Sequence, residues 1–137
     1  MRREKLVTAE SQKARVDEIL AVYRSQGVAV HCDLRRVPLH SLIATQDGIE
    51  ADKLEVVRRL VQQGKLTIPV VVEEHFLNDR LTHYLLDGHC RVRSLIEAGK
   101  TSVEAYVLWS PAGTFRSNFI EVARQYGDVR VKDLPLV

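Results

Sequence analysis

A short strand that runs through a glycine directly into a helix is the feature that most constrains this chain. Residues 85–86 are apolar at strand spacing, Gly88 breaks the pattern, and apolar residues then recur at helical spacing from Val92 to Gly99. The first N–H groups of a helix have no intrahelical partner, and its dipole is positive at that end. The pattern therefore predicts a strand-to-helix corner that can hold an anion, with a plain polar surface turn as the alternative.

The side chains around this corner bear groups suited to phosphate chemistry. Gly88 lets a ligand approach the backbone closely, and Arg91 is able to grip a phosphate. His89 can move a proton near neutral pH, and Asp87 can bind a metal ion. Cys90, between them, is interpreted as an unreactive thiol, although its place near a helix N-terminus and Arg91 could lower its pKa.

Length and composition indicate one ordinary globular domain. The 137 residues are 45% apolar and 28% charged, with 20 basic and 18 acidic residues and a formal net charge of +2. That charge is too small to indicate nucleic-acid binding by itself. No apolar run approaches the roughly 20 residues needed to span a bilayer, and no signal peptide follows the basic start of the chain, so we expect a cytoplasmic protein without a membrane partner. Cys32 and Cys90 are expected to be two reduced thiols rather than a disulfide or a zinc site.

Hydrophobic periodicity divides the chain into alternating helices and strands. We expect an N-terminal amphipathic helix over 9–26, a half-buried strand over 28–34 with Cys32 pointing inward and His31 outward, and a strand end at Pro38. Asn78 and Asp79 indicate a hairpin turn. The remaining expected elements are an irregular or helical turn after Pro38, a helix closed by Gly64, strands over 68–72, 81–86 and 103–108, helices over 89–98 and 115–126, and a short strand over 129–131.

These elements predict a single α+β domain over 1–137, a small mixed sheet flanked by helices. Its parts are an N-terminal helix that packs on the core over 1–27, the core itself over 28–110, and a C-terminal helix and tail over 111–137. The N-terminal helix could instead serve a partner or a second copy, so the oligomeric state stays open, a homodimer included.

The order of motifs resembles the ParB/sulfiredoxin superfamily, whose ParB-like N-terminal domains have this α+β architecture. The resemblance covers roughly residues 34–110 and rests on the segments 37–43, 68–72, 86–91 and 103–107 with a helix between the first two. Partition ParB proteins bind the phosphates of CTP through a Gly-Glu-Arg-Arg-like box, of which this chain keeps Gly88 and Arg91. Sulfiredoxins have Gly-Gly-Cys-His-Arg, and His89 stands where their reactive cysteine would be.

The central turn is most similar to that of free-serine kinases and their stand-alone relatives. Their pattern, Asp-Gly-x-x-Arg or Asp-Gly-His-x-Arg, is matched by Asp87, Gly88, His89 and Arg91. The resemblance also implies an acidic residue on the loop before the first core helix, which activates the hydroxyl acceptor. Asp47 is the nearest match, with Glu50 as the second choice; capping of the helix that follows is the plainer interpretation of these acids.

The leading hypothesis is a nucleotide-binding protein that transfers or hydrolyses a terminal phosphoryl group, an ATP- or ADP-dependent small-molecule kinase or a nucleotide hydrolase. Gly88, His89, Cys90 and Arg91 would bind the phosphates of ATP, ADP or CTP. Asp47, Asp87 and His89 would be catalytic, and Asp87 would also hold Mg²⁺. Whether the chain is an enzyme stays open, as does the identity of the hydroxyl-containing substrate.

The alternative is a non-enzymatic, nucleotide-gated or DNA-associated ParB-like module. It would use a basic face made of Arg58, Arg59, Lys65, Arg91, Arg93 and Lys100. In the kinase hypothesis Arg93 is instead a solvated surface charge. Nuclease activity ranks last, because no cluster of metal-binding carboxylates stands out in the sequence.

Overall fold

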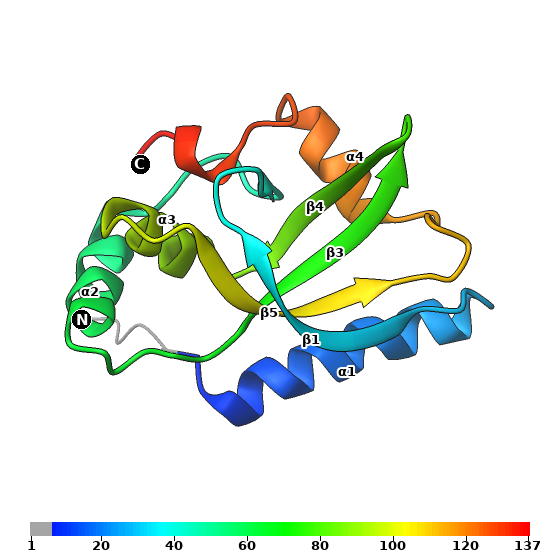
Figure 1. Cartoon of the computed structure of the whole chain (residues 1–137), viewed down its shortest axis with the longest axis horizontal. Helices are drawn as coiled ribbons and strands as arrows, with labels where there is room; N and C mark the ends of the chain where they lie inside the picture. The colour runs from blue at the N-terminus through cyan, green and yellow to red at the C-terminus, as the bar shows by residue number, and fades with distance from the viewer. Residues whose placement is uncertain (1–6) are drawn as a thin grey trace.

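The structure is a computed structural model, and it describes residues 7–137 as one α+β domain (Figure 1). The first six residues of the expected 1–27 segment lie outside the described part. The helices are α1 (Ala9–Ser25), α2 (Ala51–Gln62), α3 (His89–Glu97) and α4 (Asn118–Gln125), followed by a 3₁₀ turn at Val131–Asp133. The strands are β1 (His31–Pro38), β2 (Ile43–Ala44), β3 (Val70–Leu77), β4 (Arg80–Asp87) and β5 (Ser102–Trp109).

The five strands form one mixed sheet in the order β1-β5-β3-β4-β2. β3 and β4 form an antiparallel hairpin, closed by Asn78 and Asp79 with φ of 50° and 61°. Two left-handed residues in succession are typical of a hairpin turn, so the hairpin expected from the sequence is confirmed. The chain then passes through α3 and returns as β5, which lies parallel to β3 and antiparallel to the edge strand β1.

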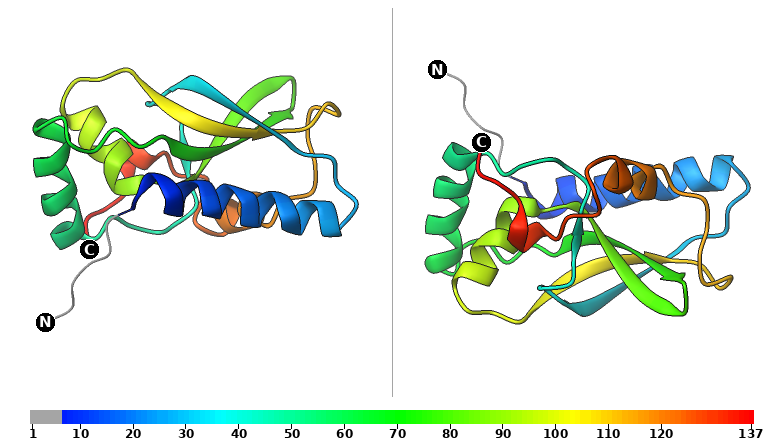
Figure 2. Two further views of the ribbon diagram at one scale, coloured as in Figure 1. Left: turned by 90° about the horizontal axis from the view of Figure 1, so that it is seen from below. Right: turned by 90° about the horizontal axis from the view of Figure 1, so that it is seen from above.

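Helices cover both faces of the sheet and bury two apolar cores. Alternate residues of β3 separate them, because side chains of a strand point to opposite faces. Val70 and Val72 belong to a core with residues of α2 and α3, whereas Val71 belongs to a core with residues of α1 and α4. Figure 2 shows α1 and α4 on one side of the sheet, with α2 and α3 gathered at one end of the molecule.

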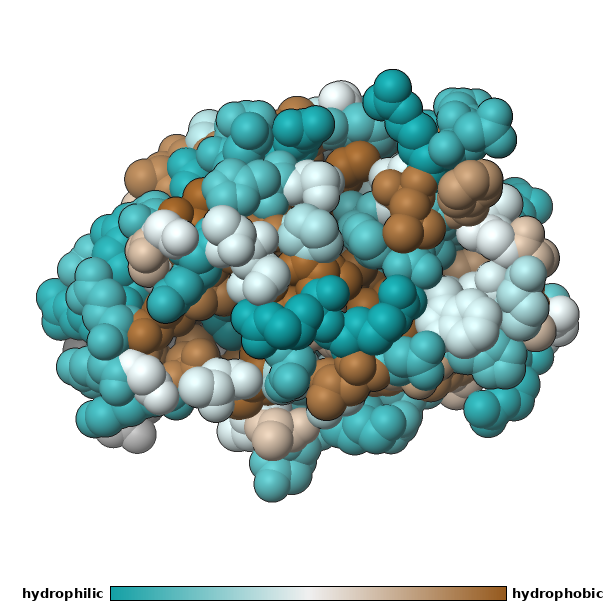
Figure 3. Space-filling model, viewed as in Figure 1, coloured by the Kyte–Doolittle hydropathy of each residue, from teal (hydrophilic) through white to brown (hydrophobic). Residues whose placement is uncertain are grey.

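Part of the sheet stays open to solvent. In the view of Figure 3, apolar side chains show through in the middle of the molecule, and hydrophilic ones surround them. The exposed large apolar side chains include Leu34 on β1, Phe76 on β3 and Leu81 on β4. Within residues 7–137, no helix is both long enough and apolar enough to cross a membrane.

Several sequence expectations need correction at the edges of the fold. The first strand begins at His31 rather than at residue 28, and Leu34, expected to face inward, is 53% exposed. Cys32 is half-buried, as expected for an inward position, and it forms no disulfide with Cys90. The last helix is shorter than 115–126 and begins after Ser117 caps its first turn.

The C-terminal tail forms no strand of its own at 129–131. Arg130 does make an isolated antiparallel β-bridge with Ile43 of β2, so the expected strand is reduced to a single bridge before Val131 begins the 3₁₀ turn. Leu136 makes a second, parallel bridge with Ile49 in the loop that follows β2. The N–H of Ile49 donates to the carbonyl of Pro135 at 2.9 Å, and that of Val137 donates to the carbonyl of Ile49 at 2.8 Å. The tail thus braces residues 45–50, which connect the sheet to α2 and include Asp47.

Candidate functional site

The strand-to-helix corner has the form that the sequence predicts. β4 ends at Asp87, Gly88 takes a left-handed conformation with φ of 108°, and α3 begins at His89. A Cβ on Gly88 would lie 2.5 Å from Cγ1 of Val70, so only glycine fits here. Among the described residues no side chain caps α3, whereas Thr8 caps α1. The first N–H groups of α3, at the positive end of its dipole, therefore have no capping side chain among residues 7–137.

A cleft of about 730 Å³ opens beside this corner, between α1 and the start of α2. Ligand-binding clefts for small molecules commonly have about 300 to 1,000 Å³, so a nucleotide-sized molecule would fit. The corner contributes Asp87, Gly88, His89, Cys90 and Arg91; the opposite walls include Thr8, Ser11, Arg15, Gln46 and Lys53.

Arg91 is buried at the base of the cleft. Its Nη1 donates to the carbonyl oxygens of Ile68 and Pro69, at 2.8 and 3.2 Å, and its Nη2 donates to Oε1 of Gln12 at 2.6 Å. All three acceptors are neutral, so hydrogen bonding to the described residues does not neutralise the guanidinium charge. Burial lowers the pKa of Arg91 below its usual value, while the nearby charge of Asp87 opposes that shift.

His89 is also buried, and it faces the loop before α2. Its Nε2 accepts a hydrogen bond from the backbone N–H of Thr45 at 3.1 Å. Burial lowers its pKa to about 4; the charge of Asp87 works against this shift, and that of Lys53 adds to it. The imidazole is therefore neutral near pH 7 and carries its proton on Nδ1, the nitrogen that could donate to a ligand.

The corner brings together Asp87, Gly88, His89, Cys90 and Arg91, but Asp47 lies apart from them. Asp47 is exposed on the loop before α2 and does not line the cleft, although its neighbour Gln46 does. Glu50 is likewise exposed and stands at the N-cap of α2 without a side-chain capping bond. Both remain candidates for a base only if the loop or the substrate bridges that gap.

The site offers carboxylate oxygen for a metal ion mainly through Asp87. Its Oδ2 accepts a hydrogen bond from Nε2 of Gln12 at 3.2 Å, and no described residue donates to Oδ1. Mg²⁺ commonly uses one or two carboxylates together with water and phosphate oxygens, which fits this single residue. In the described part of the chain, no three His, Cys, Asp or Glu side chains cluster as metal ligands would.

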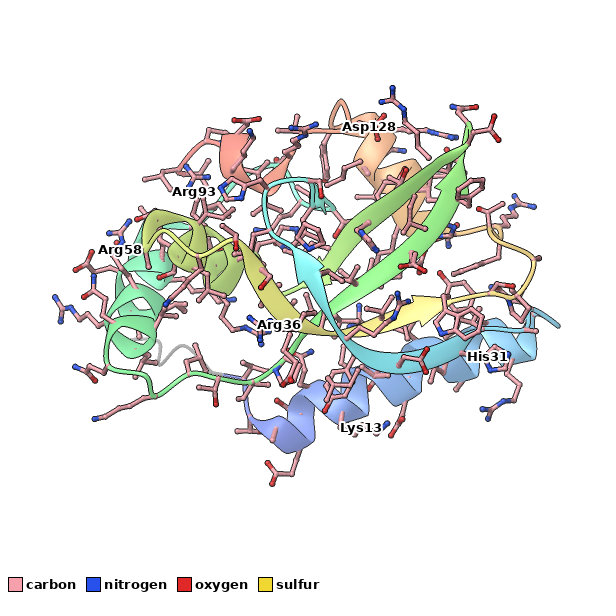
Figure 4. The ribbon with its side chains drawn as sticks, viewed as in Figure 1. Lys13, His31, Arg36, Arg58, Arg93 and Asp128 are labelled. Carbon is pink, nitrogen blue, oxygen red and sulfur yellow. The ribbon has the colours of Figure 1, made fainter. Side chains whose placement is uncertain are left out.

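The six residues grouped as a basic face do not form one. Arg91 is buried, and Arg93 is not a solvated charge: its Nη1 donates to the carbonyls of Val131 and Leu134, at 3.0 and 2.9 Å. Figure 4 shows Arg93 next to the C-terminal segment and Arg58 on α2. Arg58 pairs with Glu97 at 2.8 Å, which reduces the positive charge there. The sequence pattern could not reveal these partners, because they lie far along the chain.

Three residues at the site were not predicted from the sequence: Gln12, Lys53 and Thr45. Gln12 precedes Val16 by one helical turn and is fully buried, so it extends the inward stripe of α1. A polar residue at that spacing was the one available signal, since a buried amide needs partners. Nothing comparable marks Thr45 or Lys53.

Comparison with known proteins shows a likeness in fold. No protein family model matches the sequence, and no curated protein matches it. Among solved structures, protein Atu1540 from Agrobacterium tumefaciens superposes with a TM-score of 0.50 at 22% identity, covering 71% of this chain and 49% of that one. A Pnob8-like ParB-N domain gives a TM-score of 0.49 at 12% identity, covering 73% of this chain and 39% of that one.

This chain therefore spans about half the length of Atu1540. At this identity the likeness concerns the fold alone. The α+β architecture expected from the sequence, a small mixed sheet flanked by helices, is confirmed.

Proposed function

We propose that this chain binds a nucleotide in the cleft, with the phosphates at the N-terminus of α3. The observation that carries the proposal is that Arg91 is a buried cation whose hydrogen-bond acceptors among the described residues are all neutral. It lies next to the N-terminus of α3, which no side chain of the described residues caps. The charge of Asp87 acts on Arg91 from nearby, but no described carboxylate is hydrogen-bonded to the guanidinium. A buried charge without a directly bonded counter-charge is costly, and a bound phosphate would supply one. Lys53 on the facing wall adds a second cation within the same cleft.

The reaction that this arrangement would serve best is phosphoryl transfer or hydrolysis. Such reactions depend mainly on positioning and on neutralising phosphate charge. In the proposed mechanism the backbone N–H groups after Gly88 and the guanidinium of Arg91 hold phosphate oxygens, while Nδ1 of His89 donates to the transferred group. Asp87 would hold Mg²⁺, which would help to neutralise phosphate charge, or would orient the acceptor. Asp47, with Glu50 as the second choice, would take the proton from the attacking hydroxyl or water once the loop before α2 or the substrate bridges the gap to the cleft.

Calorimetry with ATP, ADP and CTP, with and without Mg²⁺, tests nucleotide binding. Lys53→Ala is the variant of choice, because Lys53 is exposed at the cleft and its loss should not affect folding. We expect it to weaken binding about fivefold to tenfold, since one phosphate contact is lost. Lys65→Ala, an exposed lysine beyond the end of α2 that does not line the cleft, should bind as the wild type does.

Failure of all three nucleotides to bind at millimolar concentration would overturn the proposal. Binding without release or transfer of phosphate would keep the nucleotide site and reject the enzyme. Salt-dependent binding of duplex DNA by a chain that binds no nucleotide would favour the DNA-associated module instead.

A further inference from the structure

Gln12 lies behind the wall of the cleft and reaches both charged residues of the corner. It is 0% exposed, on the same inward stripe of α1 as Val16, Ile19 and Tyr23. Its Nε2 donates to Oδ2 of Asp87 at 3.2 Å, and its Oε1 accepts from Nη2 of Arg91 at 2.6 Å. Gln12 does not line the cleft itself, so any effect on a ligand must pass through these two residues.

Both ends of the Gln12 amide match their partners. A primary amide has one acceptor oxygen and one donor nitrogen, so it can satisfy a guanidinium on one side and a carboxylate on the other. A glutamate at this position would neutralise the charge of Arg91 and repel Asp87. A lysine would repel Arg91 and neutralise the charge of Asp87. An apolar residue would leave the buried Arg91 and the half-buried Asp87 without these hydrogen bonds.

We propose that Gln12 is a positioning residue, whose neutral amide holds Arg91 at the base of the cleft and leaves the guanidinium charge available to a phosphate. Glutamine at this position anchors the guanidinium as a carboxylate would, but without cancelling its charge. The proposal rests on the proposed phosphate site and specifies what tunes it. It also assigns α1, interpreted from the sequence as a packing helix, a part in ligand affinity.

The substitution Gln12→Glu tests this proposal, because it keeps the shape of the side chain and adds one charge. At pH 7.5 we expect at least tenfold weaker binding of ADP and of inorganic pyrophosphate, since the introduced carboxylate would neutralise Arg91. As the pH falls towards 5.5, the introduced carboxyl group takes up a proton in a growing fraction of molecules, which its burial and the charge of Asp87 favour and the charge of Arg91 opposes. It then has one donor and one acceptor, as glutamine does, so the ratio of wild-type to variant affinity should approach one.

Matched variants separate this effect from general ones. Gln62→Glu adds the same charge on the exposed side of α2 and should bind as the wild type does at every pH. Gln12→Met removes both hydrogen bonds without adding charge, so it should weaken binding severalfold with no recovery at low pH. Unfolding by urea, measured for each variant, shows whether the folded state is retained; if Gln12→Glu does not fold, Gln12→Met decides the test.

The outcomes separate the inference from the proposed function. A wild-type chain that binds neither probe overturns both together. If the wild type binds the probes, two results for Gln12→Glu overturn the inference and leave the proposed function in place. One is an affinity equal to that of the wild type at pH 7.5, and the other is an affinity reduced by the same factor at pH 7.5 and at pH 5.5. Wild-type affinity in Gln12→Met also overturns it, because the position of Arg91 would then not depend on the amide.

Discussion

The backbone N–H of Thr45 donates to Nε2 of His89 at 3.1 Å, which ties the loop before α2 to the first residue of α3. This bond requires an unprotonated Nε2, and burial lowers the pKa of His89 to about 4. The proton of a neutral imidazole therefore sits on Nδ1 throughout the neutral range. One hydrogen bond thus fixes both the orientation and the tautomer of a side chain that lines the cleft.

This relationship predicts how stability depends on pH. The unfolded chain takes up a proton at His89 near its ordinary pKa of 6.5, but the folded chain does so only near 4. The free energy of unfolding should therefore fall as the pH drops from 6.5 to 4, by up to about 3 kcal/mol from this residue. Urea unfolding at several pH values measures the slope.

A pair of histidine variants assigns that slope to His89. His89→Gln keeps an acceptor for Thr45 and cannot titrate, so most of the decline between pH 6.5 and 4 should disappear. His40→Gln removes an exposed histidine and should leave the decline unchanged. An unaltered slope in His89→Gln would show that another group is responsible.

The corner at Gly88 gives a second prediction, on backbone geometry. Gly88 and Gly99 both have positive φ, 108° and 79°, so alanine is strained at either position, by about 1 kcal/mol. Only at Gly88 would the new Cβ meet Val70, at 2.5 Å; at Gly99 no described atom lies within 4 Å. Gly88→Ala should cost about 2 kcal/mol more than Gly99→Ala in urea unfolding. Equal costs would mean that Val70 moves aside freely.

The sequence was sufficient to predict the corner, because its signals are local. Gly88 separates two different hydrophobic periods, and Asn78 with Asp79 marks the hairpin that leads to it. Such patterns depend on neighbours within a few residues. The hairpin turn was therefore predicted, and β4, α3 and β5 were predicted to within one residue of their observed bounds. β3 runs on to Leu77, five residues beyond the strand expected over 68–72.

The rest of the site depends on contacts between distant parts of the chain. Gln12 meets Asp87 and Arg91 across 75 and 79 residues, and no local pattern specifies that pairing. The partners of Arg93 come from the C-terminal tail for the same reason. β2 has only two residues, too few to show a period. The alternation of apolar and polar residues along β1 could not predict that part of its inward-facing side would stay exposed to solvent.

A third prediction concerns the other end of α1, where Tyr23 donates to Oε2 of Glu73 at 2.6 Å. Glu73 is fully buried, and its Oε1 lies 2.6 Å from Nε2 of His75, so the carboxylate depends on these two partners. Burial and the charge of Glu73 raise the pKa of Tyr23, which keeps the phenol protonated and able to donate. Tyr23→Phe removes this donor and should lower the free energy of unfolding by about 1 to 3 kcal/mol. Tyr126→Phe, on an exposed ring, should change it by less than about 0.5 kcal/mol. Equal values for the two variants would mean that packing rather than the buried hydrogen bond holds this end of α1 to the sheet.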